Sequence, residues 1–198
     1  MPTLVLATRN RGKLKEIQQM LGDQVQVQSL DAYPDAPEVV EDGETFEANA
    51  IKKAREIAIH TGKPALGDDS GLVVDALDGA PGIYSARYAG ENATDADNNQ
   101  KLLNNLQGIP HEKRTAHFCC VMALVTPDGQ SQTAKAIWEG HILTEPRGEH
   151  GFGYDPLFLV PTHNCTSAEL PTDDKNQLSH RGQALRSILP QILALFQE

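Results

Sequence analysis

The chain has 198 residues and a formal net charge of −10, from 17 Lys and Arg residues against 27 Asp and Glu residues. This negative charge excludes a broad electrostatic attraction to nucleic-acid backbones or anionic membranes, so we expect neither a nucleic acid polymer nor a membrane as a partner. The length predicts a single domain over residues 1–198, with a core large enough to fold without a covalent cross-link or a structural metal ion.

The cysteines and the start of the sequence favour a cytoplasmic protein. Cys119 and Cys120 are adjacent inside an apolar run and Cys165 is isolated, a pattern that matches neither a disulfide framework nor a zinc site. The opening Met-Pro-Thr-Leu-Val-Leu-Ala lacks the basic leader and the cleavage site of a secretory signal. We therefore expect reduced cysteines and a cytoplasmic location.

The first third of the chain alternates strand and helix signals. Residues 3–7 form a β-rich run, and the apolar residues that follow at helical spacing predict a helix ending at Gly22. Residues 25–27 alternate as in a half-buried strand, and the polar, acidic stretch 31–45 cannot belong to the core. A second helix follows this stretch, with a threonine N-cap before it and Gly62 beyond its end.

The middle of the chain predicts further strands and one helix. Residues 65–67 and 72–77 are typical of strands, and the intervening Asp-Asp-Ser-Gly predicts a polar turn at 68–71. A capped helix is expected from about 95 to 106. The continuous apolar run 116–125 indicates a buried central strand.

The last third is richer in loops. A return strand is expected to end near Trp138, a glycine-rich loop covers 145–155, and a strand covers 157–160. The final helix is expected to begin near Ser179, with a kink at Pro190. Early strand–helix units followed by consecutive strands predict an α/β fold with a mixed sheet.

The first candidate site is the loop between the first strand and the first helix, made of Thr8, Arg9, Asn10, Arg11, Gly12 and Lys13. A helix N-terminus offers N–H groups and the positive end of the helix dipole to a phosphate. The alternative is a capped helix whose basic first turn is merely solvated. Four basic residues oppose the dipole here unless an anion offsets them, namely Arg9, Arg11, Lys13 and Lys15, and this favours phosphate.

The second candidate site is acidic. One stretch carries Asp31, Asp35, Glu38, Glu41, Asp42, Glu44 and Glu47, and Asp68 and Asp69 stand next to each other further on. Mg²⁺ takes oxygen ligands of this kind, usually one or two carboxylates with water and substrate phosphate in the remaining positions. A metal could therefore join the two groups, with a solvated surface as the alternative for the acidic stretch. The adjacent Asp68 and Asp69 repel each other unless a cation or a shared proton offsets them.

Two further segments could bind a planar ligand. Phe152 lies between two glycines in the sequence Gly151–Pro156, and an aromatic ring in such a loop can stack on a base. His180 and Arg181, preceded by Lys175, offer donors that could read carbonyl oxygens on a base edge. A core phenylalanine and a helix-capping histidine are the alternatives.

Six ordered motifs together carry a resemblance to a known family: Thr8-x-Asn10-x-x-Lys13, Asn49-Ala50-x-x-Lys53-Ala54, Asp68-Asp69-Ser70-Gly71-Leu72, Gly79-Ala80-Pro81-Gly82-x-x-Ser85-Ala86-Arg87, Gly151-Phe152-Gly153-Tyr154-Asp155-Pro156 and Ser179-His180-Arg181. Over essentially its whole length the chain resembles the inosine triphosphate pyrophosphatases, which act on noncanonical purine nucleoside triphosphates and are also described as dITP/XTP pyrophosphatases.

The resemblance implies a fold, an activity and partners. The implied fold is an elongated α/β domain of two lobes around a central cleft, with a mixed twisted sheet and flanking helices. The implied activity is Mg²⁺-dependent hydrolysis of ITP, dITP and XTP to the nucleoside monophosphate and pyrophosphate, which cleanses the nucleotide pool. The implied assembly is a homodimer. The order of preference among the three substrates stays open.

The resemblance also implies roles for individual residues. Asp69 is implied as the catalytic carboxylate, and Glu41 and Asp69 as metal ligands, although Asp68 remains an alternative general base. The implied substrate-binding residues are Thr8, Arg9, Asn10, Arg11, Gly12, Lys13, Lys53 and Ser70 for the phosphate side, and Phe152, Gly153, Tyr154, Asp155, Lys175, His180 and Arg181 for the base.

One departure from the family pattern concerns the second helix. Many members carry a Glu immediately before the Asn of that helix, whereas this chain has Ala48 there and Glu47 one position earlier. A shift of one residue turns a side chain by about 100° around a helix.

Two alternative functions stay open: a pyrophosphatase for modified pyrimidine triphosphates, and a nucleotide-binding module without catalysis.

Overall fold

The computed structural model describes residues 3–196, so Met1 and Pro2 of the opening sequence lie outside the described residues. Its helices are α1 (Arg11–Leu21), α2 (Phe46–Thr61), α3 (Asp95–Asn105), α4 (Thr172–Leu178) and α5 (His180–Ala194). Its strands are β1 (Thr3–Leu6), β2 (Gln26–Gln28), β3 (Ala65–Val74), β4 (Thr115–Val125), β5 (Ser131–Ile142), β6 (Phe158–Val160) and β7 (Cys165–Thr166).

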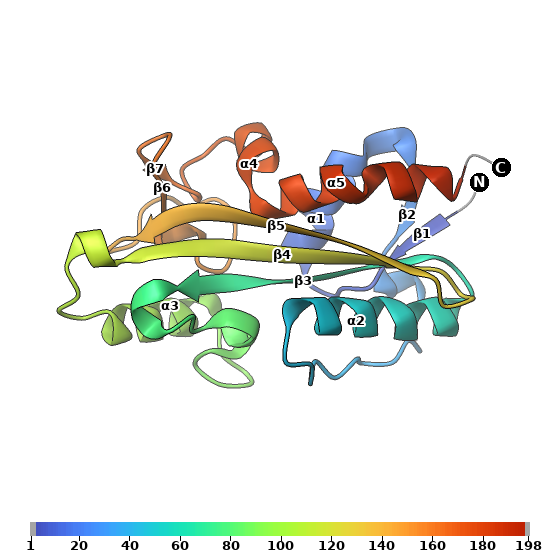
Figure 1. Cartoon of the computed structure of the whole chain (residues 1–198), viewed down its shortest axis with the longest axis horizontal. Helices are drawn as coiled ribbons and strands as arrows, with labels where there is room; N and C mark the ends of the chain where they lie inside the picture. Colours follow the sequence, from blue (N-terminus) through green and yellow to red (C-terminus); the bar gives the residue numbers. More distant parts are fainter. Residues whose placement is uncertain (1–2, 197–198) are drawn as a thin grey trace. The chain divides into compact units, whose positions relative to one another are not determined.

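The strands form one mixed sheet in the order β2-β1-β3-β4-β5-β6-β7. β1 runs parallel to β2 and to β3, with Thr3 opposite Gln26 and Val5 opposite Ala65. β6 runs antiparallel to both β5 and β7. The α/β class with a mixed sheet and flanking helices, predicted from the sequence, is thereby confirmed (Figure 1).

The chain divides into two compact units. Among the described residues, the first unit comprises 3–69, 120–136 and 180–196, and the second comprises 70–119 and 137–179. Helices α1, α2 and α5 belong to the first unit, and α3 and α4 belong to the second. Within the described residues, no helix is both long enough and apolar enough to cross a membrane.

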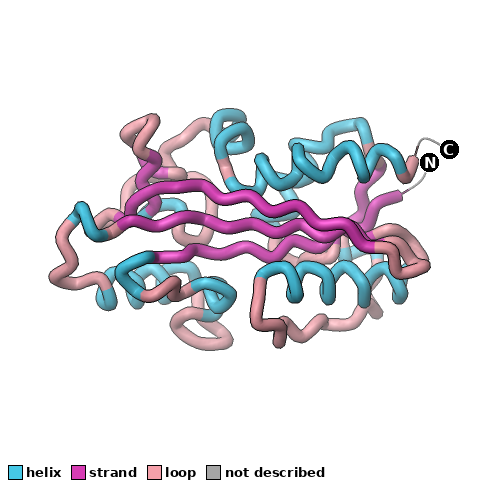
Figure 2. The backbone as a smooth tube through the Cα atoms, in the orientation of Figure 1, coloured by secondary structure: helices cyan, strands magenta, loops and turns pink. Residues whose placement is uncertain are grey.

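In the first unit, helices cover both faces of the strands. Figures 1 and 2 show α1 and α5 on one face and α2 on the other. Leu4 and Leu6 of β1 pack with Ile17 of α1 and Ile188 of α5 in one buried cluster. On the opposite face, α2 approaches β3 so closely that a Cβ added at Gly67 would lie 2.4 Å from the backbone oxygen of Ala50.

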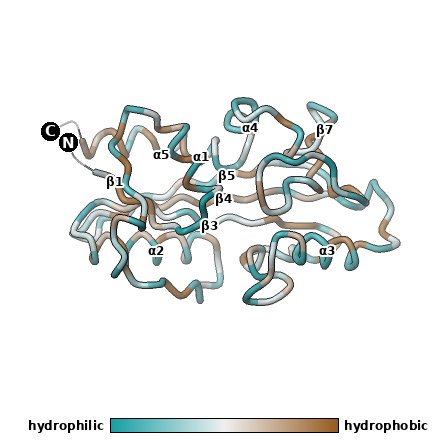
Figure 3. Tube along the Cα trace, turned by 180° about the vertical axis from the view of Figure 1, so that it is seen from behind, coloured by the Kyte–Doolittle hydropathy of each residue, from teal (hydrophilic) through white to brown (hydrophobic). Residues whose placement is uncertain are grey.

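The second unit is built around an aromatic core. The Phe158 ring lies 4.4 Å from that of Phe118 and 5.2 Å from that of Trp138, measured between centroids. Leu102 of α3 is fully buried in the same cluster. Figure 3 shows α3 as mostly hydrophilic with one short hydrophobic stretch, as expected for a helix that presents a single face to a core.

Most elements lie where the sequence places them. The predicted helix ending at Gly22 is α1, and the second predicted helix is α2, with Thr45 as N-cap and Gly62 in the left-handed conformation at its end. The expected strand 116–125 corresponds to β4, and the final helix begins at His180 and contains Pro190. The short elements α4 and β7 were not predicted.

The predicted turn at 68–71 is wrong. β3 runs without interruption from Ala65 to Val74, and a short 3₁₀ segment follows at Asp75–Leu77. Asp, Ser and Gly favour turns because of their local hydrogen bonding and backbone freedom. Here the two aspartates are buried inside a strand, where cations from other elements offset their charges.

The remaining differences concern strand ends. The return strand expected to end near Trp138 extends to Ile142 as β5, and the strand expected from residue 72 to 77 stops at Val74. Strand ends depend on pairing with neighbouring strands, which a local pattern does not contain.

Candidate functional site

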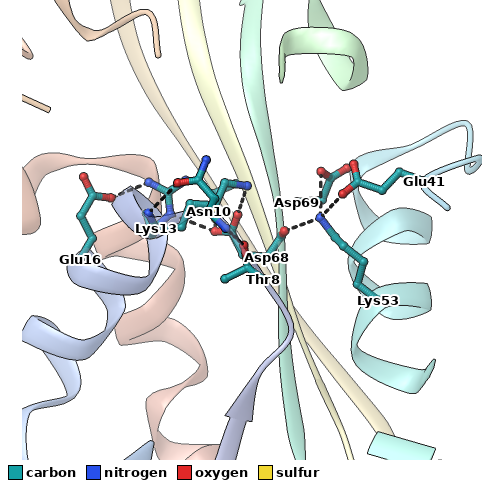
Figure 4. Close-up of polar contacts among 10 residues, drawn as sticks. Thr8, Asn10, Lys13, Glu16, Glu41, Lys53, Asp68 and Asp69 are labelled. Carbon is teal, nitrogen blue, oxygen red and sulfur yellow. Dashed lines mark hydrogen bonds and ion pairs between the residues drawn. The ribbon is translucent and has the colours of Figure 1, made fainter. Parts of the chain in front are cut away.

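The centre of the candidate site is the pair Asp68 and Asp69 on β3. Successive side chains of a strand point to opposite faces of the sheet. Asp68 therefore reaches the face that α1 and α5 cover, where it meets Lys13, while Asp69 reaches the face that α2 covers, where it meets Lys53 (Figure 4). The mutual repulsion expected of the two carboxylates is thus relieved by a separate cation on each face.

Asp68 is held in a buried ion-pair network. Its Oδ1 accepts a hydrogen bond from Lys13 Nζ at 2.5 Å, and its Oδ2 accepts from Arg181 Nε at 3.0 Å and from Cys120 Sγ at 3.2 Å. Arg181 Nη1 donates to Glu16 Oε2. Asp68 and Arg181 are only 1% and 2% exposed. The network thus ties α1, β3, β4 and α5 of the first unit together.

Charge partners decide the protonation of this network. Burial would raise the pKa of Asp68, but the charges of Arg181 and Lys13 hold that pKa well below its ordinary value. Burial would likewise lower the pKa of Arg181, but the carboxylates of Asp68 and Glu16 raise it instead. Asp68 is therefore a fixed carboxylate with both oxygens engaged, a poor acceptor for a proton.

Asp69 has a different environment on the other face. Lys53 Nζ donates to Glu41 Oε1 at 2.8 Å and to the backbone oxygen of Asp68 at 2.7 Å, and lies 3.4 Å from Asp69 Oδ1. Asp69 is 4% exposed, and its Oδ2 is buried with no hydrogen-bond partner among the described residues. Burial is the main cause that raises the pKa of Asp69 above its ordinary value, and Lys53 opposes the increase.

The contrast between the two aspartates separates their possible roles. A carboxylate with one unengaged oxygen and a raised pKa can accept a proton from water or bind a cation, whereas one engaged by three donors cannot do so without losing them. The structure therefore favours Asp69 over Asp68 as a general base.

The loop before α1 forms a capped helix N-terminus. Asn10 is the N-cap and accepts from Lys13 N at 3.1 Å, and Thr8 Oγ1 accepts from Asn10 N at 3.1 Å. Arg9 Nη2 donates to Ala36 O at 3.2 Å. Arg11 is exposed and Gly12 half-buried in the first turn.

This loop corrects one expectation. We expected that the basic residues here would be unfavourable unless a bound anion offset them. Lys13 is instead paired with the carboxylate of Asp68, so the argument from the helix dipole does not apply to Lys13.

Two residues support this site without carrying charge. Asn49, the fourth residue of α2, is fully buried, and its Oδ1 accepts from Gly43 N at 2.8 Å, which fixes the segment two residues after Glu41. Gly67 lets α2 approach β3, because any larger residue would collide with the backbone of Ala50. The first contact positions the segment that follows Glu41, and the second positions α2, the helix that carries Lys53.

A second cluster lies within the second unit. Asp155 Oδ2 accepts from Lys175 Nζ at 2.7 Å and from Phe152 N at 3.0 Å, and its Oδ1 accepts from Ser167 Oγ at 2.9 Å. The Lys175 ammonium lies 5.0 Å from the centre of the Phe152 ring. Gly151 has a φ of +76°, and a Cβ there would lie 2.1 Å from Asp155 Oδ2. The glycine is therefore required for this arrangement.

The remaining base-side residues divide between the two units. Gly153 and Tyr154 follow Phe152 in the second unit, where Tyr154 Oη donates to Ser85 O at 2.6 Å. His180 and Arg181 begin α5 and belong to the first unit, both buried. Ser70 follows Asp69 along β3 and is half-buried. The predicted residues are thus distributed over both units, and the printed contacts join Lys13 with Asp68 and Lys53 with Asp69 in the first unit and Lys175 with Asp155 in the second.

Carboxylate oxygens suited to Mg²⁺ lie beside Lys53. Among residues 3–196 there is no group of three or more His, Cys, Asp or Glu side chains able to hold a metal ion. Mg²⁺ usually takes only one or two carboxylates from a protein, and Glu41 and Asp69, which share Lys53, supply two. The buried Asp69 Oδ2, which lacks a protein partner, is an oxygen ligand of the required kind. These residues therefore fit the ion.

Glu47 points elsewhere. Its Oε1 accepts from Thr133 Oγ1 at 2.9 Å, and the residue is exposed. The one-residue shift noted at Ala48 thus leaves Glu47 engaged with β5.

Sequence reasoning missed Glu16. It stands between Lys15 and Ile17 in a basic helix, and its partner Arg181 is 165 positions away in the sequence. No local signal distinguishes it from a solvated glutamate.

Comparisons with known proteins show which family this chain resembles. A Ham1 family model matches residues 4–191. The chain is 58% identical over 186 residues to a dITP/XTP pyrophosphatase of Geobacter sulfurreducens, which covers 93% of this chain and 94% of the relative. It is 50% identical to a protein of the same name from Shouchella clausii, over 95% of each chain.

Solved structures give the same result. A HAM1 protein from Coxiella burnetii superposes with a TM-score of 0.87 and 46% identity, covering 98% of this chain and 100% of the other. A nucleoside-triphosphatase, also named dITP/XTP pyrophosphatase, from Mycobacterium abscessus superposes with a TM-score of 0.75 and 43% identity, covering 96% and 99%. With a family model over nearly its whole length and relatives at this identity, the chain belongs to the Ham1 family.

Proposed function

We propose that this chain hydrolyses noncanonical purine nucleoside triphosphates, namely ITP, dITP and XTP, to the monophosphate and pyrophosphate. The observation that carries the proposal is the buried Asp69, with one unengaged oxygen, beside the ammonium of Lys53. Such a pair can accept a proton from an attacking water and neutralise phosphate charge at the same place. The names of relatives at 50% identity and above support the same reaction.

The proposed reaction needs positioning and charge neutralisation more than covalent chemistry. The Asp69 carboxylate orients a water molecule and takes its proton as the water oxygen attacks the α-phosphorus in line with the bond to the leaving pyrophosphate. Lys53 and Lys13 reduce the negative charge on the phosphates, and the N–H groups at the start of α1 add partial positive charge. No covalent intermediate is required.

We propose Mg²⁺ as the cofactor, with Glu41 and Asp69 as its protein ligands. A bound Mg²⁺ supplies positive charge to the phosphate oxygens. Lys53, which donates to Glu41 and lies 3.4 Å from Asp69 Oδ1, holds both carboxylates in place before any ion binds. Removal of divalent cations with EDTA should abolish turnover, and added Mg²⁺ should restore it.

We propose that the base is recognised by the second cluster. Phe152 offers a ring face for stacking, and Lys175 carries only donors, which suit the 6-oxo group of hypoxanthine and xanthine but oppose the 6-amino group of adenine. Asp155 accepts from three donors and so orients Lys175. The base contacts that the sequence predicts for His180 and Arg181 stay predictions, and Arg181 donates to Asp68 and Glu16 in the first unit.

The assembly and location are further proposals. We propose a homodimer in the cytoplasm, supported by the family resemblance and, for the location, by three cysteines that form no disulfide. Light scattering of the purified chain tests the dimer.

The deciding experiment measures pyrophosphate release from dITP, dATP and a modified pyrimidine triphosphate with Mg²⁺ present. We expect rapid release from dITP and a kcat/KM at least about 10⁴-fold lower for dATP, because a hydrogen-bonding site rejects an analogue that leaves its groups unpaired. Preference for the pyrimidine would favour the first alternative. Binding of dITP without release would favour a module without catalysis.

A further inference from the structure

Helix α3 forms hydrogen bonds to the loop that carries Phe152, a contact that none of the sequence motifs predicts. Gly153 N donates to Asp95 Oδ2 at 2.8 Å, and Asn99 Nδ2 donates to Gly153 O at 2.9 Å. Asp95 and Asn99 are four residues apart, so they lie on the same face of the helix. The two side chains therefore hold both the N–H and the C=O of one glycine.

The loop needs an external restraint because of its composition. Gly151 and Gly153 have φ values of +76° and +61°, a region that glycine enters at little energetic cost. Glycine also loses more conformational freedom on folding than any other residue. The Phe152 ring stands between these two glycines. Asp155 fixes the N–H of Phe152 from one side, and α3 fixes Gly153 from the other.

Helix α3 is a firm support for such a restraint. Thr94 and Asp97 form a capping box at its start. Asn98 is buried and bonds to Ala89 N at 2.8 Å and Ala86 O at 3.1 Å, and Leu102 is fully buried in the core. A helix anchored at its start and along its inner face can hold a neighbouring loop in one conformation.

Asn99 shows that the contact is not a by-product of helix stability. Its Oδ1 is buried and has no hydrogen-bond partner among the described residues. A buried acceptor without a partner destabilises the folded chain, so a leucine or alanine would serve the helix better. What the amide provides is the hydrogen bond from Nδ2 to the loop.

We infer that Asp95 and Asn99 are positioning residues that set affinity for the nucleobase by holding the Phe152 loop. The inference rests on the proposed function, because it takes Phe152 as the surface that stacks on the base. It adds α3, a helix that contains none of the proposed phosphate ligands, to the determinants of substrate affinity.

The test compares Asp95→Ala and Asn99→Ala with the wild type for dITP hydrolysis. Each loss of a hydrogen bond to the loop should raise KM for dITP about 5- to 10-fold, with kcat changed less than about 2-fold. Inhibition by tripolyphosphate, which has no base, should stay within about 2-fold of the wild type, because the phosphate ligands lie on other elements.

Conservative variants separate positioning from folding. Asp95→Asn keeps a carbonyl acceptor for Gly153 N and should restore KM to near the wild-type value. Asn99→Asp replaces the donor by a carboxylate that faces Gly153 O, so it should raise KM more than alanine does. Gln100→Ala changes an exposed residue of the same helix and should leave both constants unchanged.

Three results would overturn the inference. They are an unchanged KM in both alanine variants, an equal loss of tripolyphosphate inhibition, and no rescue by Asp95→Asn. If the wild type releases no pyrophosphate from dITP, the proposed function fails. Equilibrium binding of dITP to the same variants then tests the loop, and wild-type affinity in the alanine variants, or no binding at all, overturns the inference as well.

Discussion

Asp68 and Asp69 should respond in opposite ways to the same substitution. Asp68→Asn removes the charge that two cations share, while the side chain keeps its size. Breaking a buried pair of this kind costs about 3–5 kcal/mol. The lower end applies, because Arg181 keeps Glu16 and the Lys13 side chain is 14% exposed and can be hydrated. For a chain of this length about 3 kcal/mol corresponds to a fall in Tm of about 6–12 °C.

Asp69→Asn should leave stability almost unchanged. The substitution affects a contact of 3.4 Å with Lys53, which keeps its shorter bonds to Glu41 and to the Asp68 carbonyl. Burial raises the pKa of Asp69, so the folded state does not favour its charge. We expect a change in the free energy of unfolding within about 1 kcal/mol, but a fall in kcat of at least about 10²-fold, because a general base is lost.

The assay pairs urea unfolding in metal-free buffer with pyrophosphate release from dITP, measured well below the Tm of each variant. Asp68→Asn should lose stability and retain more activity than Asp69→Asn, which should do the reverse. Equal stability of the two variants would refute the structural role of Asp68. Near-normal turnover by Asp69→Asn would move the base to another group.

Three further substitutions test buried contacts of the two units. Lys13→Ala removes one of the two cations that bond to Asp68 and should lower the free energy of unfolding by about 1–2 kcal/mol in urea titration; unchanged stability would restore the view of Lys13 as an unpaired cation. Gly67→Ala drives a Cβ to within 2.4 Å of the Ala50 carbonyl and should cost about 1–3 kcal/mol by thermal melting. Arg114→Met removes the donors to four backbone carbonyls in the second unit and should lower the free energy of unfolding in denaturant by about 3 kcal/mol or more. The control Gln100→Ala should leave the free energy of unfolding unchanged.

The helices could be predicted because their signals are local. Thr45 caps α2 by accepting from Ala48 N, and Gly62 closes the helix by donating to Ala58 O. Each of these contacts joins residues three or four positions apart, so the sequence alone contains both partners. The same reasoning placed α1 and α3 and the apolar strand β4.

The prediction of a turn at 68–71 was wrong because the contacts that decide this segment are not local. What keeps Asp68 in a strand are cations that lie 55 and 113 positions away in the chain, on Lys13 and Arg181. A local pattern of Asp, Ser and Gly contains no trace of them. The family motif nevertheless marked Asp68 and Asp69 as candidate site residues, because a motif contains residue types and spacing and not the elements that surround them.

The supporting residues were the hardest to predict. Glu16 and Asn99 each bond to a distant segment, 165 and 54 positions away. Both belong to helices whose sequence is mostly polar, so neither stands out from its neighbours. Only the folded chain shows that they bond to Arg181 and to the backbone of Gly153.

The alternation of β3 explains how two adjacent aspartates can have different roles. A strand turns successive side chains to opposite faces, and helices with different cations cover the two faces of the first unit. On the face of α1 and α5, Lys13 and Arg181 engage both oxygens of Asp68 and make it a poor acceptor for a proton. On the face of α2, Lys53 divides its bonds among Glu41, a carbonyl and Asp69, and one carboxylate oxygen stays unengaged. The number of donors on each face therefore decides which aspartate stabilises the fold and which one can act on water.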